Sequence, residues 1–600
     1  MPKITFLPDN IEIERPAGSS LLEAARLAGV FVETPCGGKG TCQKCRVRIT
    51  ANGEQYALLC QAAVPDEAVT VALPASLYAP GLRPGENRFE TLYEDMSVNL
   101  RGNREMFLKN VFFQVPPPAL LDGLSDADRF SRAFLKTTEC ASVELPLNVV
   151  TVLPEKLREA DGKVLVFYYI DNNIAKVINI IARSLPSALR HGVAVDIGTT
   201  TVDLWLVDLE NGKVLAALNA YNSQVECALD VIGRINYAKK FLPDLRMRVL
   251  NTINELLSGA CANAGVDPAG IMCVSLAGNT TMTHLLLGIM PEYIRLAPYT
   301  PAVFCPQVYT AGQLGISACD NAPVLFAPAV GSYVGGDITA GLLCTSLAAC
   351  NGQTDTLVLF IDIGTNGEIV LGNRDFIFAC ACSAGPAFEG GGIKHGIRAC
   401  AGAVERVAIK DGKPEVYTIG GAPPVGICGS GIISAIAEMF RKGIIDSAGK
   451  FADPAYVKKG EYILHDAEPQ GISISETDIN NFIRAKGAIF SACQTMLDSV
   501  GMSFGDVGRV YVAGGFGRFL DLEDARTVGL LPRLPDEKFT FLGNSSVTGA
   551  CLTMVCEDFR IKEHQLAGTI TYVDLSNEPK YMDHYTGALF LPHTDRKLFD

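Results

Sequence analysis

Three cysteines and three glycines lie within twelve residues near the N-terminus, in the stretch TPCGGKGTCQKC at 34–45. Cys36, Cys42 and Cys45 have the spacing C-x5-C-x2-C, and Cys60 follows after 14 further residues. Glycines let the backbone curl around a metal cluster and direct amide N–H groups at its sulfurs, which stabilises the reduced state. This order of ligands favours a [2Fe-2S] cluster. A zinc site, which usually needs two C-x2-C pairs, and a group of plain buried thiols are the alternatives.

A second chemical pattern, Asp-Ile-Gly-Thr, occurs twice, in VAVDIGTTTVDLWLVDL at 193–209 and in LFIDIGTNGEIVLG at 359–372. In both, an apolar strand ends in a polar turn and another strand follows. RVYVAGGFGRFLD at 509–521 adds a further strand that ends in glycines. Glycine lets backbone amides approach phosphate oxygens, and threonine hydroxyls add donors. The chain contains neither G-x4-G-K-[ST] nor G-x-G-x-x-G, so the pattern predicts a duplicated lobe and a different kind of phosphate site.

Carboxylates accompany these turns. Asp196 and Asp362, facing one another from two lobes, would hold Mg²⁺ through water, since magnesium keeps several waters and needs few carboxylates. Asp337 follows the glycine pair at 335–336 and either orients a water at the γ-phosphate or caps a helix. The segment GSG at 429–431 precedes a helical pattern, so its amides either meet a nucleotide or only begin the helix.

The elements that must position these residues fall into four regions, 1–77, 78–105, 106–190 and 191–600. The first is predicted to hold two strands over KITFLPDNIEIERP, a helix over SSLLEAARLAGV and a strand over KCRVRIT. The second is rich in proline, glycine and charge and is predicted to be a linker. The third is predicted to be a small α+β domain, with a strand in FLKNVFFQV, a helix over SDADRFSRAFLK and another helix over 172–190. The fourth carries the duplicated pattern.

Composition excludes several classes of function. Of 600 residues, 48% are hydrophobic and 19% charged, and the net charge is −14, without a basic stripe that would neutralise a nucleic-acid backbone. The longest apolar run, VLVFYYI at 164–170, is far too short for a membrane span, and the N-terminus lacks the pattern of a signal peptide. We therefore expect a cytoplasmic protein whose 19 cysteines are reduced thiols or metal ligands.

Two parts of the chain resemble known families. Residues 1 to about 75 resemble a plant- or adrenodoxin-type ferredoxin domain with PCGGKGTCQKC as its cluster loop, although the gap before Cys60 is shorter than in stand-alone ferredoxins. DIGTTT, DIGTNGE and AGGFG resemble the two phosphate hairpins and the adenosine motif of the ASKHA superfamily, whose two RNase H-like lobes clamp ATP. The resemblances imply a multidomain fold of α+β and α/β class. It would have a β-grasp ferredoxin domain, a small α+β middle domain and a C-terminal two-lobed RNase H-like domain.

The whole chain is similar to the reductive activators of corrinoid-dependent enzymes, which carry segments like SAGPAFEGGGI at 383–393. The resemblance implies an ATP-hydrolysing activase that passes a low-potential electron through a [2Fe-2S] cluster to the inactive Co(II) corrinoid of a methyltransferase-system protein and restores Co(I). It also implies Mg²⁺, a low-potential electron donor and a homodimer. An ATP-binding iron–sulfur redox sensor without net corrinoid reduction is the alternative. An activase for a radical dehydratase is a third interpretation.

The candidate site residues fall into three sets. The cluster would be held by Cys36, Cys42, Cys45 and Cys60. The catalytic carboxylates would be Asp196 and Asp362, with Asp337 as a further candidate. By matching motif, the nucleotide would be bound by Gly198, Thr199, Thr200, Gly364, Thr365, Asn366, Gly367, Gly514, Gly515 and Phe516.

Overall fold

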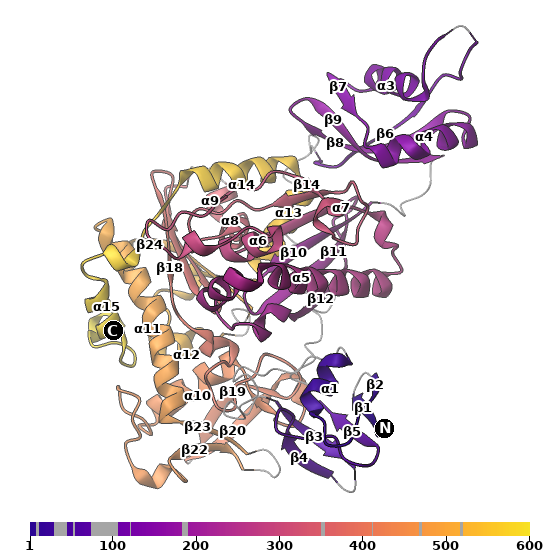
Figure 1. Cartoon of the computed structure of the whole chain (residues 1–600). Helices are drawn as coiled ribbons and strands as arrows, with labels where there is room; N and C mark the ends of the chain where they lie inside the picture. The colour runs from indigo at the N-terminus through magenta and orange to yellow at the C-terminus, as the bar shows by residue number, and fades with distance from the viewer. Residues whose placement is uncertain are drawn as a thin grey trace.

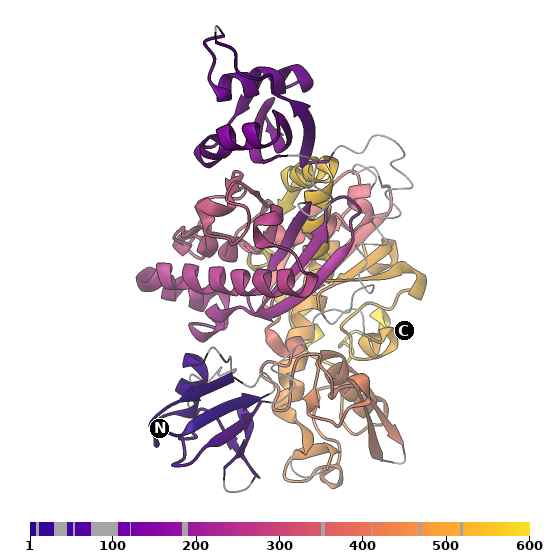
Figure 2. The ribbon, with the colours of Figure 1, turned by 90° about the vertical axis from the view of Figure 1, so that its right-hand side faces the viewer.

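A computed structural model of the chain describes residues 1–7, 11–28, 30, 45–51, 54–73, 106–120, 122–182, 190–349, 354–410, 412–466, 471–515 and 520–599. A large body in the centre holds two lobes (Figures 1 and 2). In both views the N-terminal domain and the domain at 106–182 lie at opposite ends of this body. None of the helices in the described ranges combines the length and apolar character that a membrane crossing requires.

The N-terminal domain is a five-stranded sheet in the order β2-β1-β5-β3-β4, crossed by one helix. The Ser20 hydroxyl accepts the Glu23 N–H at 3.3 Å and caps this helix. β1 pairs antiparallel with β2 and parallel with β5, and Ile4, Phe6 and Leu21 form its core with their neighbours. This arrangement confirms the β-grasp prediction. The elements are β1 Lys3–Leu7, β2 Ile11–Glu14, α1 Leu21–Leu27, β3 Arg46–Thr50, β4 Glu54–Leu58 and β5 Val69–Ala72.

Residues 106–182 form a four-stranded sheet in the order β6-β8-β9-β7, with two helices. Phe130 and Phe134 of α3 pack with Leu153 of α4 against one face. Ile178 packs from the other face into the core of the large body, and the Asn321 side chain donates to its carbonyl at 3.1 Å. The domain is therefore fixed to the large body. Its elements are β6 Lys109–Gln114, α3 Asp126–Thr137, β7 Ser142–Glu144, α4 Leu147–Glu159, β8 Lys163–Asp171 and β9 Ile174–Ala182.

The helix expected over 172–190 is wrong for its described part. Residues 174–182 form β9, which pairs antiparallel with β8. Asn172 and Asn173 have φ of 50° and 64°, and positive φ at both positions is the mark of a two-residue hairpin turn in which asparagine is favoured. Buried and half-buried residues alternate along β9 until a register shift opposite Phe167 and Tyr168, where Ile178 is an extra buried residue. This bulge breaks the alternation of apolar residues, so the run resembles a helical pattern.

The two lobes of the large body repeat one topology. In the order β12-β11-β10-β13-β15, three antiparallel strands are extended by two parallel ones. The order β18-β17-β16-β24-β25 repeats this arrangement strand for strand, which confirms the predicted duplication. The strands are β10 His191–Ile197, β11 Thr201–Asp208, β12 Val214–Tyr221, β13 Ile271–Gly278, β14 Tyr309–Thr310, β15 Pro323–Phe326, β16 Leu357–Ile363, β17 Gly367–Gly372, β18 Ile377–Cys382, β24 Val507–Ala513, β25 Phe539–Gly543 and β26 Ile570–Tyr572.

Helices cover both sheets and also lie between them. α8 and α13 share one core with Trp205 of the first sheet and Phe360 of the second. A Cβ on Gly549 of α13 would lie 2.0 Å from the Ala340 carbonyl oxygen of α8, so glycine allows these helices to cross closely. α5 and α6 cover the outer face of the first sheet, and α10, α11 and α12 that of the second. The helices are α5 Val231–Ala264, α6 Thr280–Leu287, α7 Ala311–Leu314, α8 Gly336–Leu342, α9 Ser346–Ala349, α10 Gly429–Arg441, α11 Glu476–Ser499, α12 Leu522–Thr527, α13 Ser545–Val555, α14 Glu557–Thr569 and α15 Tyr581–Ala588.

Two small sheets complete the second lobe at the end nearest the N-terminal domain in Figure 1. One has the order β20-β19-β21 and the other pairs β22 with β23. A Cβ on Gly431 would lie 2.0 Å from the Val404 carbonyl oxygen of β19, so the GSG segment at 429–431 starts α10 in close contact with this sheet. These strands are β19 Ala403–Lys410, β20 Lys413–Thr418, β21 Gly426–Ile427, β22 Glu461–His465 and β23 Ile472–Ser475.

Candidate nucleotide site

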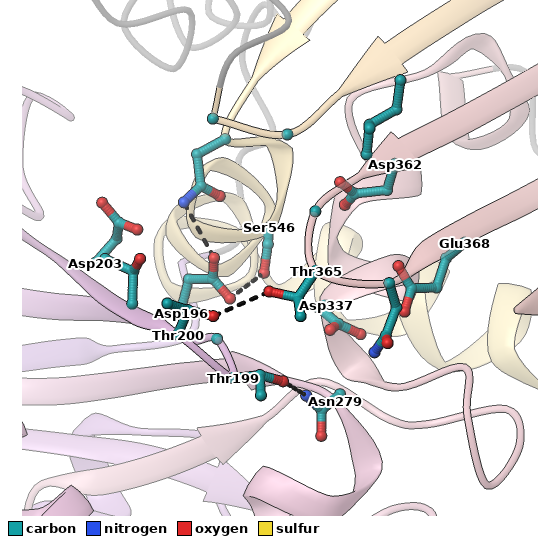
Figure 3. A pocket seen from close by; sticks show the side chains of 18 of the residues that line it. Asp196, Thr199, Thr200, Asp203, Asn279, Asp337, Asp362, Thr365, Glu368 and Ser546 are labelled. Atoms are coloured by element: carbon teal, nitrogen blue, oxygen red, sulfur yellow. Dashed lines mark hydrogen bonds between the residues drawn. The ribbon is translucent and has the colours of Figure 1, made fainter. Parts of the chain in front are cut away.

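The duplicated topology brings three predicted turns to one pocket between the lobes (Figure 3). The turn at 198–201 follows β10, the turn at 363–366 follows β16, and the glycines at 514–515 follow β24. Gly367 begins β17 beside the pocket, where its Cβ would lie 2.7 Å from Cys382 Sγ. Phe516 lies outside the described residues. The pocket is lined by Asp196, Gly198, Thr199, Thr200, Thr201, Asp203, Asn279, Asp337, Asp362, Ile363, Gly364, Thr365, Asn366, Glu368, Glu389, Gly514, Gly515, Asn544, Ser545 and Ser546.

Four carboxylates of this pocket form two equivalent cross-strand pairs. Asp196 of β10 is opposite Asp203 of β11, and Asp362 of β16 is opposite Glu368 of β17. Like charges directly opposite in a sheet destabilise it. Burial, followed by the charge of Asp196, raises the pKa of Asp203 and of Asp362 to about 7. Burial, followed by nearby aspartates, raises the pKa of Glu368 well above its usual value. Such a set of oxygen donors is suited to a cation.

Asp337 lies in the first turn of α8 and lines the same pocket. Gly335 occupies the N-cap position, so the interpretation of Asp337 as the helix cap is wrong. Burial, followed by the charges of Asp196 and Asp362, raises the pKa of Asp337 to about 8. Asp337 Oδ1 accepts the Ile338 N–H at 3.0 Å, and the side chain lines the pocket.

The carboxylate of Asp196 is held from the start of α13. Its two oxygens accept hydrogen bonds from Asn544 Nδ2 at 3.0 Å and from Ser546 Oγ at 2.9 Å (Figure 3). Both donors favour the ionised form, although burial is the larger effect and raises the pKa of Asp196. Asp196 is thus fixed in position by neutral donors from a segment about 350 residues further along the chain.

Two asparagines have the same double role at the ends of two strands. Asn279 caps α6 by accepting the Met282 N–H at 3.0 Å, and its amide nitrogen donates to Thr199 Oγ1 at 3.0 Å. Asn544 caps α13 by accepting the Val547 N–H at 3.1 Å, while its amide nitrogen donates to Asp196. Sequence reasoning missed both residues. The repeated segments GNTTMT at 278–283 and GNSSVT at 543–548 are the signal that would have found them.

Threonine hydroxyls join the two lobes in the centre of the pocket. Thr200 Oγ1 lies 2.9 Å from Thr365 Oγ1, and the Thr365 hydroxyl donates to Glu389 Oε2 at 2.7 Å. Because a hydroxyl has one proton to donate, the Thr200 hydroxyl donates to Thr365. Glu389 was missed by sequence reasoning, although it lies within the segment SAGPAFEGGGI.

The pocket residues fit a magnesium–polyphosphate ligand. Gly514 has φ of 105°, and a Cβ there would lie 2.2 Å from the Ile363 carbonyl oxygen, so only glycine brings the backbone this close to the second turn. In the described part of the chain, no three His, Cys, Asp or Glu side chains converge as direct ligands of one ion. A Mg²⁺ ion here would therefore keep most of its waters, as Mg²⁺ prefers.

Two of the four predicted cluster ligands lie at one end of a hairpin in the N-terminal domain. Cys45 immediately precedes β3 and Cys60 closely follows β4. The Leu59 N–H donates to the Cys45 carbonyl at 2.8 Å, which holds these two segments together. Neither cysteine is in a disulfide, so both sulfurs remain able to act as cluster ligands. Cys36 and Cys42 lie outside the described residues.

Three cysteines of the second lobe pack in its core. Cys380 and Cys382 of β18 and Cys493 of α11 are buried in one core. Burial raises the pKa of each thiol, so these thiols are protonated and inert at neutral pH.

Four protein-family models match successive segments of the chain. They are the 2Fe-2S iron-sulfur cluster binding domain at 4–65, the RACo linker region at 102–185, the RACo middle region at 191–349 and the C-terminal domain of RACo, the ASKHA domain, at 356–600. These descriptions use "linker" and "middle" for segments other than our predicted linker at 78–105 and middle domain at 106–190, and our boundaries stay a prediction.

Characterised relatives match over long stretches. The corrinoid activation enzyme RamQ of Eubacterium limosum is 28% identical over 601 residues, which cover 96% of each chain. The [Co(II) methylated amine-specific corrinoid protein] reductase of Methanosarcina barkeri is 26% identical over 60% of this chain and 68% of its own. A solved structure of a reductive activator for corrinoid, iron-sulfur protein is 39% identical, covers 100% of both chains and superposes with a TM-score of 0.77.

Proposed function

This chain belongs to the family of reductive activators of corrinoid proteins, and from that premise we propose that it uses ATP to return an inactive Co(II) corrinoid protein to Co(I). The acceptor would be the corrinoid protein of a methyltransferase system. The observation that carries the proposal is the end-to-end likeness to the solved reductive activator, at 39% identity.

The N-terminal domain would supply the electron. Cys36, Cys42, Cys45 and Cys60 would hold a [2Fe-2S] cluster, which transfers single electrons at low potential when bound. The support is that Cys45 and Cys60 lie at one end of the hairpin β3–β4 and that neither is in a disulfide.

The pocket between the lobes would bind and hydrolyse ATP. The backbone of the turns at 198–201 and 363–366 would bind phosphates, and Gly514 and Gly515 would let the nucleotide approach the end of β24. Asp196 and Asp362 would hold Mg²⁺ through water, and Asp337 would accept a hydrogen bond from the attacking water. The two cross-strand acidic pairs support this assignment, because a cation relieves their mutual repulsion.

Nucleotide binding would control the electron transfer to the acceptor. A plant-type cluster has a potential of roughly −400 mV, and an acceptor ~100 mV lower costs about 2.3 kcal/mol per electron. Phosphates bound between the turns would touch Thr200 of the first lobe and Thr365 of the second, and so would fix the angle between the lobes. ATP binding and hydrolysis would thereby alter how the protein holds its partner.

Three further features are part of the proposal. A low-potential electron carrier would reduce the cluster, and the protein would act in the cytoplasm as a homodimer. None of the described cysteines is in a disulfide, which agrees with a reducing compartment.

The test is anaerobic absorption spectroscopy of a Co(II) corrinoid protein mixed with this protein, a low-potential reductant and Mg-ATP. We expect the Co(I) band to grow with ATP and not without it. Several methyltransferase corrinoid proteins should be tried. If the cluster is reduced and ATP binds but Co(I) forms with none of them, the protein is an ATP-binding redox sensor instead.

A further inference from the structure

In the turn at 198–201, three successive carbonyl groups accept hydrogen bonds from Asn222 and Arg234. The Gly198 carbonyl accepts from Asn222 Nδ2 at 3.0 Å, and the Thr200 carbonyl accepts from the Asn222 N–H at 2.9 Å. The Thr199 carbonyl between them accepts from Arg234 Nη2. Asn222 and Arg234 are both fully buried, so this side of the turn is closed to solvent.

This bracing fixes the direction of the amide groups. In a trans peptide the C=O and the following N–H point in opposite directions. Since the three carbonyls point back to Asn222 and Arg234, the N–H groups of Thr199, Thr200 and Thr201 point away from them, toward the pocket that these residues line. In the part of the chain that the structure describes, neither the Thr199 nor the Thr200 N–H donates to another backbone or side-chain acceptor. Successive N–H groups that converge in this way form an anion-binding concavity.

Arg234 also brings a positive charge to this position. Its other hydrogen bonds go to neutral acceptors, the Ala228 carbonyl at 3.1 Å, Gln224 Oε1 at 3.1 Å and Met282 Sδ at 3.1 Å. The charge of Asp230 also acts on the guanidinium, but no described carboxylate forms an ion pair with it. Burial lowers the pKa of Arg234 to about 9, so the guanidinium is charged at neutral pH. A buried charge without an ion-pair partner is costly unless something compensates it.

The lining of the pocket has no positively charged side chain of its own among the described residues. Among its described residues are six carboxylates, those of Asp196, Asp203, Asp337, Asp362, Glu368 and Glu389, and no lysine or arginine. A polyphosphate entering this pocket needs a positive potential besides that of Mg²⁺. The guanidinium directly behind Thr199 provides one.

We propose that Arg234, with Asn222, is a positioning residue for the phosphates of ATP. It aims the amides of the first turn into the pocket and supplies the positive potential that the lining lacks. The proposal rests on the proposed function of this pocket as the ATP site. It assigns a phosphate-specific role to a buried residue that does not touch the nucleotide.

The test compares the dissociation constants of ATP and of adenosine for the full chain, measured by calorimetry in the presence of Mg²⁺. Arg234→Met should weaken ATP binding about 10- to 100-fold, the range for loss of a charged hydrogen bond, and adenosine binding less than about 3-fold. Arg234→Lys keeps the positive charge but cannot donate all the hydrogen bonds of the guanidinium. Its affinity for ATP should therefore lie between those of Arg234→Met and the wild type. The control is Arg526→Met, which removes another buried arginine that donates to a carbonyl, that of Leu534. It should change neither constant.

The outcomes separate the two proposals. Equal losses of ATP and adenosine affinity in Arg234→Met, or unchanged ATP affinity, would overturn the role of Arg234. If Arg234→Met does not fold, as shown by its thermal transition, Arg234→Lys decides alone: it must weaken ATP more than adenosine. A wild-type protein that binds adenosine and ATP equally weakly would contradict the proposed ATP site itself.

Discussion

The hydroxyl of Thr200 in the first lobe lies 2.9 Å from the hydroxyl of Thr365 in the second. Thr200 follows the first Asp-Ile-Gly-Thr sequence and Thr365 belongs to the second, so the repeated segments meet at the centre of the pocket. The chain of donors continues to Glu389, whose Oε2 accepts the Thr365 hydroxyl at 2.7 Å. A phosphate between the turns would compete for these hydroxyls, which links the ligand to the contact between the lobes.

Thr365→Val tests this link, because valine keeps the shape of threonine and removes both hydrogen bonds. Loss of a hydrogen bond to a charged group costs about 1.5–3 kcal/mol. We expect the rate of ATP hydrolysis to fall about 10-fold or more. The control is Thr569→Val, whose hydroxyl donates only to the Leu566 carbonyl at the end of α14. Equal rates for the two variants would show that the threonine contact has no part in hydrolysis.

The sequence predicted the strands and turns that carry Asp196 and Asp362, because each motif is local and occurs twice. It did not predict Asn544 and Ser546, which reach Asp196 only after the chain has formed the whole second lobe and α13 has returned to the first sheet. The strand β9 was mistaken for a helix because a bulge at Ile178 breaks the alternation of polar and apolar residues. Asn172 and Asn173, at positive φ, were the local sign of the hairpin.

The N-terminal cysteines give a prediction that is independent of the nucleotide. Cys45→Ser should lower the iron content well below the ~2 atoms per chain of a [2Fe-2S] protein and remove its visible absorption. ATP binding should not change, because Cys45 belongs to the separate core of the N-terminal domain. Cys140→Ser, in the domain at 106–182, is the matched control and should keep its iron. A Cys45→Ser protein with full iron content would remove Cys45 from the ligand set.

Glu563 on α14 predicts a pH dependence of stability. Its side chain is 2% exposed, and Oε1 has no hydrogen-bond partner among the described residues. Burial raises its pKa to about 8 from 4.5, although Arg560 opposes this. The folded state therefore binds a proton more tightly than the unfolded state. The penalty for ionisation is absent below the unfolded pKa and grows until the pH exceeds about 8.

Glu563→Gln removes this titration. At pH 5 the free energies of unfolding of the variant and the wild type should differ by less than about 1 kcal/mol, whereas at pH 9 the variant should be more stable by about 4 kcal/mol. Denaturant unfolding at both pH values measures the difference. Glu255→Gln, at an exposed position of α5, is the control and should shift neither value. A gain from Glu563→Gln that is equal at both pH values would contradict a raised pKa of Glu563.

The two asparagines at 279 and 544 offer a paired test of how the site is built. Serine is as good an N-cap as asparagine, so Asn279→Ser and Asn544→Ser should preserve α6 and α13 and remove only the amide donor. The donor from Asn544 reaches the carboxylate of Asp196, whereas that from Asn279 reaches the neutral hydroxyl of Thr199. Hydrogen bonds to charged groups contribute about twice as much as neutral ones.

We therefore expect Asn544→Ser to lower the rate of ATP hydrolysis about 10- to 100-fold and Asn279→Ser only about 3- to 10-fold. Steady-state hydrolysis with saturating Mg-ATP gives the rates, and circular dichroism checks that the helices persist. Asn254→Ser, which removes a donor to the Gly315 carbonyl elsewhere in the first lobe, is the control and should keep the wild-type rate. If Asn279→Ser were the slower enzyme, the phosphate turn and not the Asp196 carboxylate would limit hydrolysis, and the role given to Asn544 would be wrong.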